Sequence, residues 1–208
     1  PVRQAAWTMS LHVMDMDDDN DWDIVYSERR GQLRGMWWLR HPGPNNLHQT
    51  WKATRMSGHQ HEVMFMNPRP FDPLLPQAFV AATSGGPMLL TEKAPATQQR
   101  VLEEVWNTRQ IAMPENTGTG KAAALGDING DGVLDLVVTC ERAEGKHGVF
   151  WMSQIADNAW SAQAISGLEG TKFDLVILID LDGDGDLDVA TCEEGENLGI
   201  IWYENPYG

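Results

Sequence analysis

The nonapeptide 180-DLDGDGDLD-188 places a carboxylate at every second position. A second copy, 127-DINGDGVLD-135, begins 53 residues earlier, and a looser third, 15-DMDDDNDWD-23, begins 112 residues before that. Packing so many carboxylates together without a cation would raise their pKa values and destabilise the turn. The three loops therefore predict sites for a hard cation, and their spacing predicts a repeat of about 53 residues.

Each acidic loop lies within the same succession of short apolar runs. A first run leads into the loop, a second follows it, a third begins near a glycine and carries a tryptophan, and a fourth is more polar. Around the loop at 127–135 these runs are 121–126, 136–140, 148–152 and 159–165. Four short strands joined by tight turns are the unit of a β-propeller blade, which buries its faces only against neighbouring blades. The aromatic residues of the third runs are expected to fill the layers between blades.

A further repeat with an eroded loop is expected between the first two acidic loops, because about two periods separate them. Its strands are predicted at 62–66, 77–83, 86–92 and 99–107, and a helix is the alternative for the last of these. The connection 67-NPRPFDPLLP-76 has four prolines and a single Asp, so it cannot form the same ion cage. The sequence thus predicts an all-β propeller of four-stranded antiparallel blades, with repeats at about 5–57, 58–115, 116–168 and 169–208.

The acidic loops place oxygen ligands at positions 1, 3, 5 and 9 and a main-chain carbonyl at position 7, with a Gly or Asn turn at position 6. All-oxygen ligation suits Ca²⁺ better than Mg²⁺ or a soft metal, so two or three Ca²⁺ sites are predicted. An EF-hand is excluded because position 12 is Tyr26, Val138 or Thr191, where that motif needs Glu. The predicted ligand residues are Asp15, Asp17, Asp19, Asp21 and Asp23; Asp127, Asn129, Asp131, Val133 and Asp135; and Asp180, Asp182, Asp184, Asp186 and Asp188.

The pattern D-x-[DN]-x-D-G-x-x-D between two strands resembles the FG-GAP/VCBS repeat family, which includes the calcium-bearing blades of integrin α-subunits and of many bacterial surface proteins. The segment from 173 to 206 is similar to the C-terminal blades of bacterial VCBS-repeat proteins. This resemblance implies that the chain supplies four blades of a propeller of about seven, with a homodimer or further blades covering its ends. Alternatively, Pro1 to Gln4 pair beside the last, three-stranded repeat and close a ring of four. The resemblance also implies an extracellular, periplasmic or cell-surface location.

Composition excludes several classes of protein. The formal net charge of -15 disfavours nucleic acid and anionic membranes as partners, although fourteen of the thirty acidic residues lie in the three loops. No apolar run has the length of about 20 residues that a membrane helix needs, so no membrane insertion is expected. The chain starts at Pro1 without a leader, as expected of a mature form or a fragment. Cys140 and Cys192 can form one disulfide at most and are expected to be thiols on strands.

Two functions remain open for the edge of the propeller opposite the acidic loops, and a third possibility, a purely structural repeat in a larger surface protein, predicts no pocket there. The favoured hypothesis is a non-catalytic module that binds a glycan or a protein, and the alternative is a polysaccharide lyase with His61 or a lysine as base. No nucleophile elbow, phosphate loop or dinucleotide fingerprint is present in the sequence. The candidate ligand-binding residues at this edge are Arg29, His59, His61, Lys121, Glu141, Lys172 and Glu193.

Overall fold

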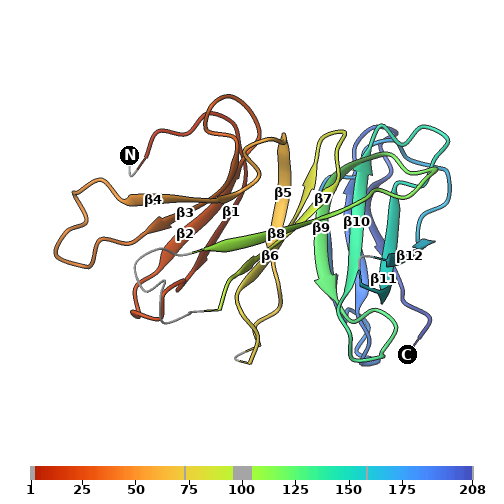
Figure 1. Ribbon diagram of the computed structural model, residues 1–208. Helices are drawn as coiled ribbons and strands as arrows, with labels where there is room; N and C mark the ends of the chain where they lie inside the picture. Colours follow the sequence, from red (N-terminus) through yellow and green to blue (C-terminus); the bar gives the residue numbers. More distant parts are fainter. Residues whose placement is uncertain (1–2, 73, 96–104, 158, 208) are drawn as a thin grey trace.

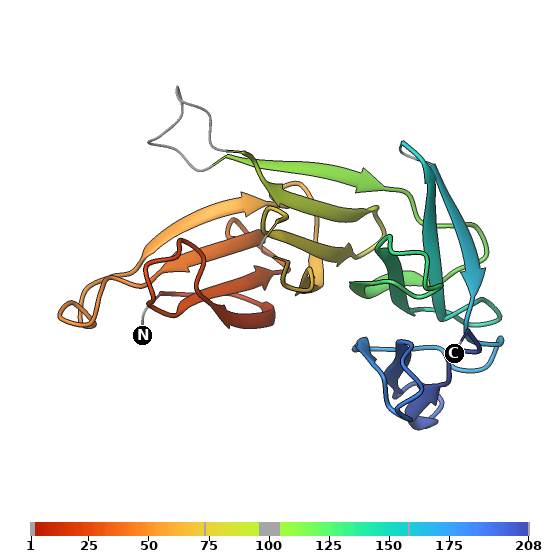
Figure 2. The same ribbon diagram turned by 90° about the horizontal axis from the view of Figure 1, so that it is seen from below.

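The computed structural model describes residues 3–72, 74–95, 105–157 and 159–207. Within these residues it contains β-strands and no helix. These strands form four separate antiparallel sheets, each continuous in the sequence. Figures 1 and 2 show the sheets following one another in chain order around a common axis, with the first and fourth at opposite ends of the series. The protein has the β-propeller fold that the repeat predicted, with four blades.

Each blade is a simple meander, because successive strands pair in sequence order. The first blade contains β1 (Thr8–Met14), β2 (Asp23–Glu28), β3 (Gly35–Arg40) and β4 (Lys52–Ser57). The second contains β5 (Val63–Pro68), β6 (Ala78–Thr83), β7 (Met88–Lys93) and β8 (Trp106–Ile111). The third contains β9 (Thr119–Gly126), β10 (Asp135–Glu141), β11 (Val149–Ala156) and β12 (Ala159–Ala164). The fourth contains β13 (Ile177–Ile179), β14 (Asp188–Glu193) and β15 (Gly199–Tyr203), so it has three described strands instead of four.

The fourth strand of the second blade lies further along the chain than predicted. It runs from Trp106 to Ile111, whereas the sequence indicated 99–107. Residues 99–104 of that prediction, and most of the alternative helix, lie outside the described residues. The strand is fixed at Trp106, whose ring packs against Phe79 of β6 with centroids 6.0 Å apart. A contact between residues so far apart in sequence cannot be found from local periodicity.

The apolar core of the described residues has one layer between each pair of neighbouring blades, and a fourth cluster with Tyr26, Trp37 and Leu39 lies on the other face of the first blade. Because successive side chains of a strand point to opposite faces, β11 serves two layers at once. Phe150 packs toward the second blade and Trp151 toward the fourth. Trp38 of β3 is 1% exposed in the layer between the first and second blades. Trp38, Phe150 and Trp151 therefore lie in interblade layers, as predicted, whereas Trp37 packs with Tyr26 and Leu39 on the other face of the first blade.

The first strands of the four blades surround the common axis. Residues of β1, β5, β9 and β13 line one cavity of about 260 Å³, including Ser10, Phe65, Ala122 and Ile177. Arg3 lies over the ring of Trp37 in the first blade, 3.8 Å from its centroid, and not beside β15. The prediction that Pro1 to Gln4 complete the last blade is therefore wrong for Arg3, whose guanidinium stacks on an aromatic ring instead, while Pro1 and Val2 lie outside the described residues.

Both cysteines are free thiols. Cys140 is buried and burial raises its pKa to about 12, whereas Cys192 is partly exposed. None of the described residues forms a helix long and apolar enough to cross a membrane.

Candidate functional site

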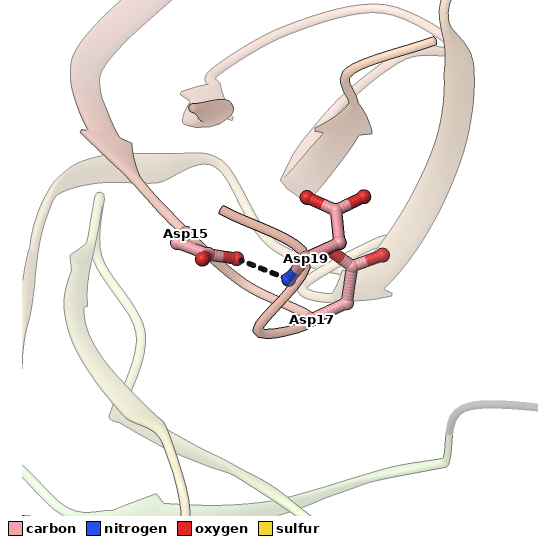
Figure 3. A group of neighbouring side chains, drawn as sticks. All are labelled: Asp15, Asp17 and Asp19. Carbon is pink, nitrogen blue, oxygen red and sulfur yellow. Dashed lines mark hydrogen bonds between the residues drawn. The ribbon is translucent and has the colours of Figure 1, made fainter. Parts of the chain in front are cut away.

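The three acidic loops connect the first strand of a blade to its second, so the antiparallel meander carries them to the same edge of the propeller. In each loop the first Asp fixes the turn by accepting backbone hydrogen bonds. Asp15 accepts from the N–H groups of Asp19 and Asn20 at 3.2 and 2.9 Å, the first of which is drawn in Figure 3. Asp127 accepts from positions 5 and 6 of its own loop, and Asp180 from positions 4 and 6. The three loops thus share one local fold.

Two positions of each loop have a left-handed backbone. At position 6, φ is +67° at Asn20, +83° at Gly132 and +102° at Gly185. Position 4 is also left-handed, and in the first loop it is occupied by Asp18, with φ of +60°. Asp and Asn enter this region more readily than most residues, which explains how the first loop folds without glycine. The turn that the sequence predicted at position 6 is confirmed.

The ninth carboxylate of each loop lies buried at the base of the turn. Asp23, Asp135 and Asp188 are at most 1% exposed. Each accepts a hydrogen bond from the N–H of the second loop residue, at 3.2, 3.0 and 3.2 Å respectively. One oxygen of each ninth carboxylate therefore closes the loop, which leaves the other available to a ligand or to a neighbouring backbone group.

The remaining carboxylates gather at the open side of the turn. Oxygen atoms of Asp15, Asp17 and Asp19 lie within 4.8 Å of one another, and the same holds for Asp180, Asp182 and Asp184. Figure 3 shows the first group around its turn. Three negative charges at this separation repel one another unless a cation lies between them. Their all-oxygen donor set fits a hard divalent cation such as Ca²⁺, which would draw its remaining ligands from position 7 carbonyls and water.

Basic neighbours modify the first loop. Nε of Arg40 lies 2.9 Å from Oδ2 of Asp17, and Nδ1 of His41 lies 3.2 Å from Oδ2 of Asp21. Burial raises the pKa of the Asp17 carboxyl, Arg40 opposes this rise, and the charges of Asp23, Asp19 and Asp15 add to it. A cation at this loop would compete with Arg40 for Asp17. The fourth-blade cluster of Asp180, Asp182 and Asp184 is fully exposed and has more freedom to reorganise around an ion.

In the third-blade loop one of the predicted cation ligands is an amide side chain, that of Asn129. Nδ2 of Asn129 donates to Oδ2 of Asp131 at 3.1 Å, and Oδ1 of Asn129 accepts from the N–H of Asp131 at 3.0 Å. Val133 at position 7 and Asp186 at the same position of the fourth-blade loop stay predicted carbonyl ligands. The second blade has Asp72 alone in the corresponding connection, where it accepts from the N–H of Leu74 at 2.8 Å.

At the opposite edge, several predicted ligand-binding residues are joined in ion pairs, and the pairs Lys121–Asp174 and Arg29–Glu62 connect neighbouring blades. Nζ of Lys121 lies 2.9 Å from Oε2 of Glu141 and 3.1 Å from Oδ1 of Asp174, and its side chain is 8% exposed. Lys172 pairs with Glu194, and Arg29 donates to Glu62 at 3.0 Å. Lys121 is thereby held in place by two carboxylates, which a substrate would have to displace.

Glu193 has a structural role of its own. It is 2% exposed and accepts hydrogen bonds from the backbone N–H groups of Thr171, Lys172, Gly195, Glu196 and Leu198. Burial would raise the pKa of Glu193, but these donors outweigh it and lower the pKa to about 2. Glu28 at the end of β2 likewise accepts from the N–H groups of Ala6 and Trp7. In both blades the glutamate at the end of the second strand therefore holds the backbone that precedes the first strand.

His59 and His61 are the two candidates that the structure brings together in a pocket. The pocket has a volume of about 300 Å³ and lies between the first and second blades. Ser57, Gln60 and the β8 residues Trp106, Thr108 and Gln110 also line it. Oγ of Ser57 and Oγ1 of Thr108 are 2.6 Å apart, which joins the outer strands of the two blades below the pocket. Arg29 and Glu141 are not among its lining residues.

Sequence reasoning missed three contributors to this edge. Asp174, which neutralises Lys121, precedes β13 and has no motif around it. Trp106 was assigned to the end of an outer strand predicted at 99–107 and Gln110 lay beyond that strand, so their convergence with His59 was not foreseen. A signal that could have found the two β8 residues is the polar run 107-NTRQ-110 after Trp106, which is typical of an exposed outer strand.

The comparison with curated proteins found no match. A family model, that of the FG-GAP-like repeat, matches residues 127–191. The match begins at the first Asp of the third-blade loop and ends within β14, so it contains two of the three acidic loops in full. Residues 127–191 are thus an FG-GAP-like repeat, in agreement with the resemblance of their loops.

Proposed function

We propose that this chain is a calcium-stabilised β-propeller module that binds a carbohydrate at the edge opposite the acidic loops. The two clusters of three carboxylates support the calcium part of the proposal. FG-GAP-like loops of this composition match the oxygen-rich sites that Ca²⁺ prefers. Calcium would rigidify the turn at one edge of each blade while the other edge meets the ligand. The likeness of residues 173–206 to the C-terminal blades of bacterial VCBS-repeat proteins is part of the same proposal.

The pocket at His59 and His61 is the observation that carries the carbohydrate part. It combines one indole ring, two imidazoles, two glutamine amides and two hydroxyls within about 300 Å³. An aromatic ring can stack on the apolar face of a sugar, and convergent amide and hydroxyl groups can bind its hydroxyls. A pocket lined only by apolar side chains would instead favour an apolar ligand. A saccharide unit therefore suits the pocket, and a protein ligand is the competing outcome.

The lyase alternative receives no comparable support. Such an enzyme needs a basic group beside an arginine that neutralises the substrate's carboxylate. Arg29 is held by Glu62, and Lys121 is held by Glu141 and Asp174. The arrangement of the described residues favours binding over catalysis.

The proposal includes a location outside the cytoplasm: extracellular, periplasmic or at the cell surface. Exposed calcium loops of extracellular modules have dissociation constants of about 10⁻⁴–10⁻³ M, which are useful only where calcium is abundant. A loop in which every side-chain ligand of the cluster is exposed, as in the fourth blade, suits this range.

A glycan array probed with the protein in calcium and in EDTA tests the proposed function. We expect retention of a defined saccharide class in calcium, loss of that signal in Gln110→Ala and His59→Ala, and an unchanged melting temperature in both variants. Gln163→Ala, on the equivalent outer strand of the third blade, is the matched control and should keep full binding. If no saccharide binds, or if the two pocket variants bind as well as the control, the carbohydrate proposal fails.

A further inference from the structure

The third-blade loop contains the pair Asn129–Gly130, the one place in the sequence where a glycine follows an asparagine. An asparagine side chain can lose ammonia when the backbone nitrogen of the next residue attacks its carboxamide carbon. Glycine has no Cβ to hinder this attack. Gly130 is exposed, and open space surrounds the position that a Cβ would occupy. The attacking nitrogen and the solvent that must accept its proton can therefore meet.

Asp131 holds the carboxamide of Asn129 at both ends. Its backbone N–H donates to Oδ1 of Asn129 at 3.0 Å, and its Oδ2 accepts from Nδ2 of Asn129 at 3.1 Å. Because a backbone N–H only donates and an ionised carboxylate only accepts, these contacts fix which end of the amide is the oxygen. During the attack, negative charge develops on Oδ1, and positive charge develops on Nδ2 as it takes up a proton. Each charge therefore forms beside a group of Asp131 that stabilises it.

The backbone nitrogen of Gly130 is not engaged elsewhere. Among the hydrogen bonds of the described residues, none is donated by the Gly130 N–H, and it is the N–H of Asp131 that donates to Oδ1 of Asp127 at 3.1 Å. In the fourth-blade loop the equivalent N–H, that of Gly183, donates to Oδ1 of Asp180 at 2.7 Å. The third-blade loop thus combines a free attacking nitrogen with a carboxamide that is held in place.

We propose that Asn129 is a site of spontaneous deamidation, through which the third-blade loop gains a carboxylate as the protein ages. The Gly130 nitrogen forms a bond to Cγ of Asn129, the Cγ–Nδ2 bond breaks, and the proton of the Gly130 N–H leaves with Nδ2 as ammonia. Water then opens the cyclic imide at either carbonyl. One opening gives aspartate, and the other gives isoaspartate, whose main chain runs through Cγ. No ion or saccharide takes part, so this inference goes beyond the proposed function and does not depend on it.

The two products change the loop in different ways. Aspartate at position 3 would give the third-blade loop the carboxylate spacing of Asp180, Asp182 and Asp184 in the fourth blade. The number of charged ligands is one of the properties that set the calcium affinity of such loops, so this product should bind calcium more tightly. Isoaspartate lengthens the main chain inside the turn, so the ligand groups on its two sides no longer keep their register. Deamidation would therefore strengthen the site in one product and disrupt it in the other.

Peptide masses after storage of the intact protein test the proposal. Trypsin cleavage after Lys121 and Arg142 gives a peptide in which Asn129 is the sole asparagine or glutamine. We expect this peptide to gain the mass of an acid in place of an amide severalfold faster than the peptide with Asn20. Asn20 is the matched control because it is exposed and left-handed but is followed by Asp21, which has a Cβ. EDTA in the storage buffer keeps cations out of the loop. A constant mass, or a rate no greater than at Asn20, would overturn the proposal.

The identity of the products tests the cyclic imide. Opening at either carbonyl should give two peptides of equal mass, which separate by chromatography and which fragmentation assigns to aspartate and isoaspartate. Direct hydrolysis of the amide by water would give aspartate alone. Finding no isoaspartate would therefore overturn the assigned reaction.

The carboxylate of Asp131 can be removed without losing its backbone N–H. Asp131→Ala should slow deamidation of Asn129 by about fivefold or more, because the leaving nitrogen loses a charged hydrogen-bond partner. Asp72→Ala is the matched control, since Asp72 and Asp131 both accept from the N–H two residues ahead at 2.8 Å, but in different blades. The control should keep the rate of the unaltered chain. If Asn129 reacts as fast in Asp131→Ala as in the control, Asp131 does not assist the reaction.

Discussion

Asn205, which follows the last strand of the fourth blade, reaches the acidic loop of the third: its Nδ2 donates to the carbonyl oxygen of Ile128 at 2.8 Å. The same amide donates to Leu187, and the N–H of Asn205 donates to Oδ1 of Asp188 at 2.8 Å. Asn205 is 8% exposed. One residue therefore ties together the bases of two neighbouring loops, so that ordering one loop should help to order the other.

Replacing this link should destabilise the two C-terminal blades. Asn205→Ala is expected to lower the free energy of unfolding by about 1–3 kcal/mol, because buried carbonyl groups lose their donor. Urea unfolding followed by tryptophan fluorescence measures the change. Asn46→Ala is the matched control, since the Asn46 amide also donates to a carbonyl but is exposed, and it should change stability little. Equal effects of the two substitutions would contradict the assigned role of Asn205.

Calcium removal should lower the melting temperature. At a calcium concentration about 100 times the dissociation constant, binding to the folded state alone contributes about 2.7 kcal/mol per site. For a domain of this size each kcal/mol shifts the melting temperature by about 2–4 °C, so each calcium site that EDTA empties should lower it by about 5–10 °C. Calorimetry in calcium, in magnesium and in EDTA measures the shift. Identical melting in calcium and EDTA would exclude structural calcium sites.

A single aspartate of the fourth-blade loop should account for part of that shift. Asp184→Ala is expected to lower the melting temperature in calcium by several degrees, because it removes a ligand of the bound ion. In EDTA no ion is bound, so the substitution only relieves repulsion between carboxylates and should have little effect. Asp72→Ala is the matched control, because both aspartates are exposed and accept from the N–H two residues ahead. The control should behave alike in the two buffers; if it shows the same calcium dependence as Asp184→Ala, the loop assignment is wrong.

The ion pair of Lys121 should be costly to break from one side. Lys121→Met leaves the carboxylate of Glu141 buried without its basic partner, and removing one member of a buried pair costs about 3–5 kcal/mol. Chemical denaturation of Lys121→Met, Glu141→Gln and the double variant gives the coupling between the two residues. Lys52→Met on the exposed β4 serves as control. A loss no greater than that of Lys52→Met would show that Lys121 is not held as described.

Glu193 should make stability fall at low pH. Its pKa is lowered from an ordinary value of 4.5 to about 2 in the folded protein, so its contribution is complete above the unfolded pKa and is lost as the pH falls toward 2. The stability difference between the unaltered chain and Glu193→Gln should therefore be large near neutral pH and shrink below the pKa of the unfolded carboxyl. Denaturation at a series of pH values measures this difference. Glu204→Gln, at an exposed position, should show no such trend.

The blade architecture was accessible from the sequence because it depends on local patterns. Short apolar runs such as 148-GVFWM-152 and the recurrence of the acidic loops predict the strands, and Asn20 at position 6 could be assigned to a left-handed turn from its intrinsic preference. What escaped prediction depends on proximity between blades. Lys121 meets Asp174 only because two blades pack together, and β8 begins at Trp106 because Phe79 receives its ring.

The difference between the two cysteines gives the molecule a natural attachment point for a probe. The thiol of Cys140 is buried, and with a pKa near 12 it stays protonated and unreactive toward alkylating reagents. Cys192 is reachable, and it lies beside Ile200 and Trp202 on an uncovered sheet. A maleimide fluorophore would therefore label the unaltered protein at one site, where its emission colour would report whether water or another molecule lies against that surface.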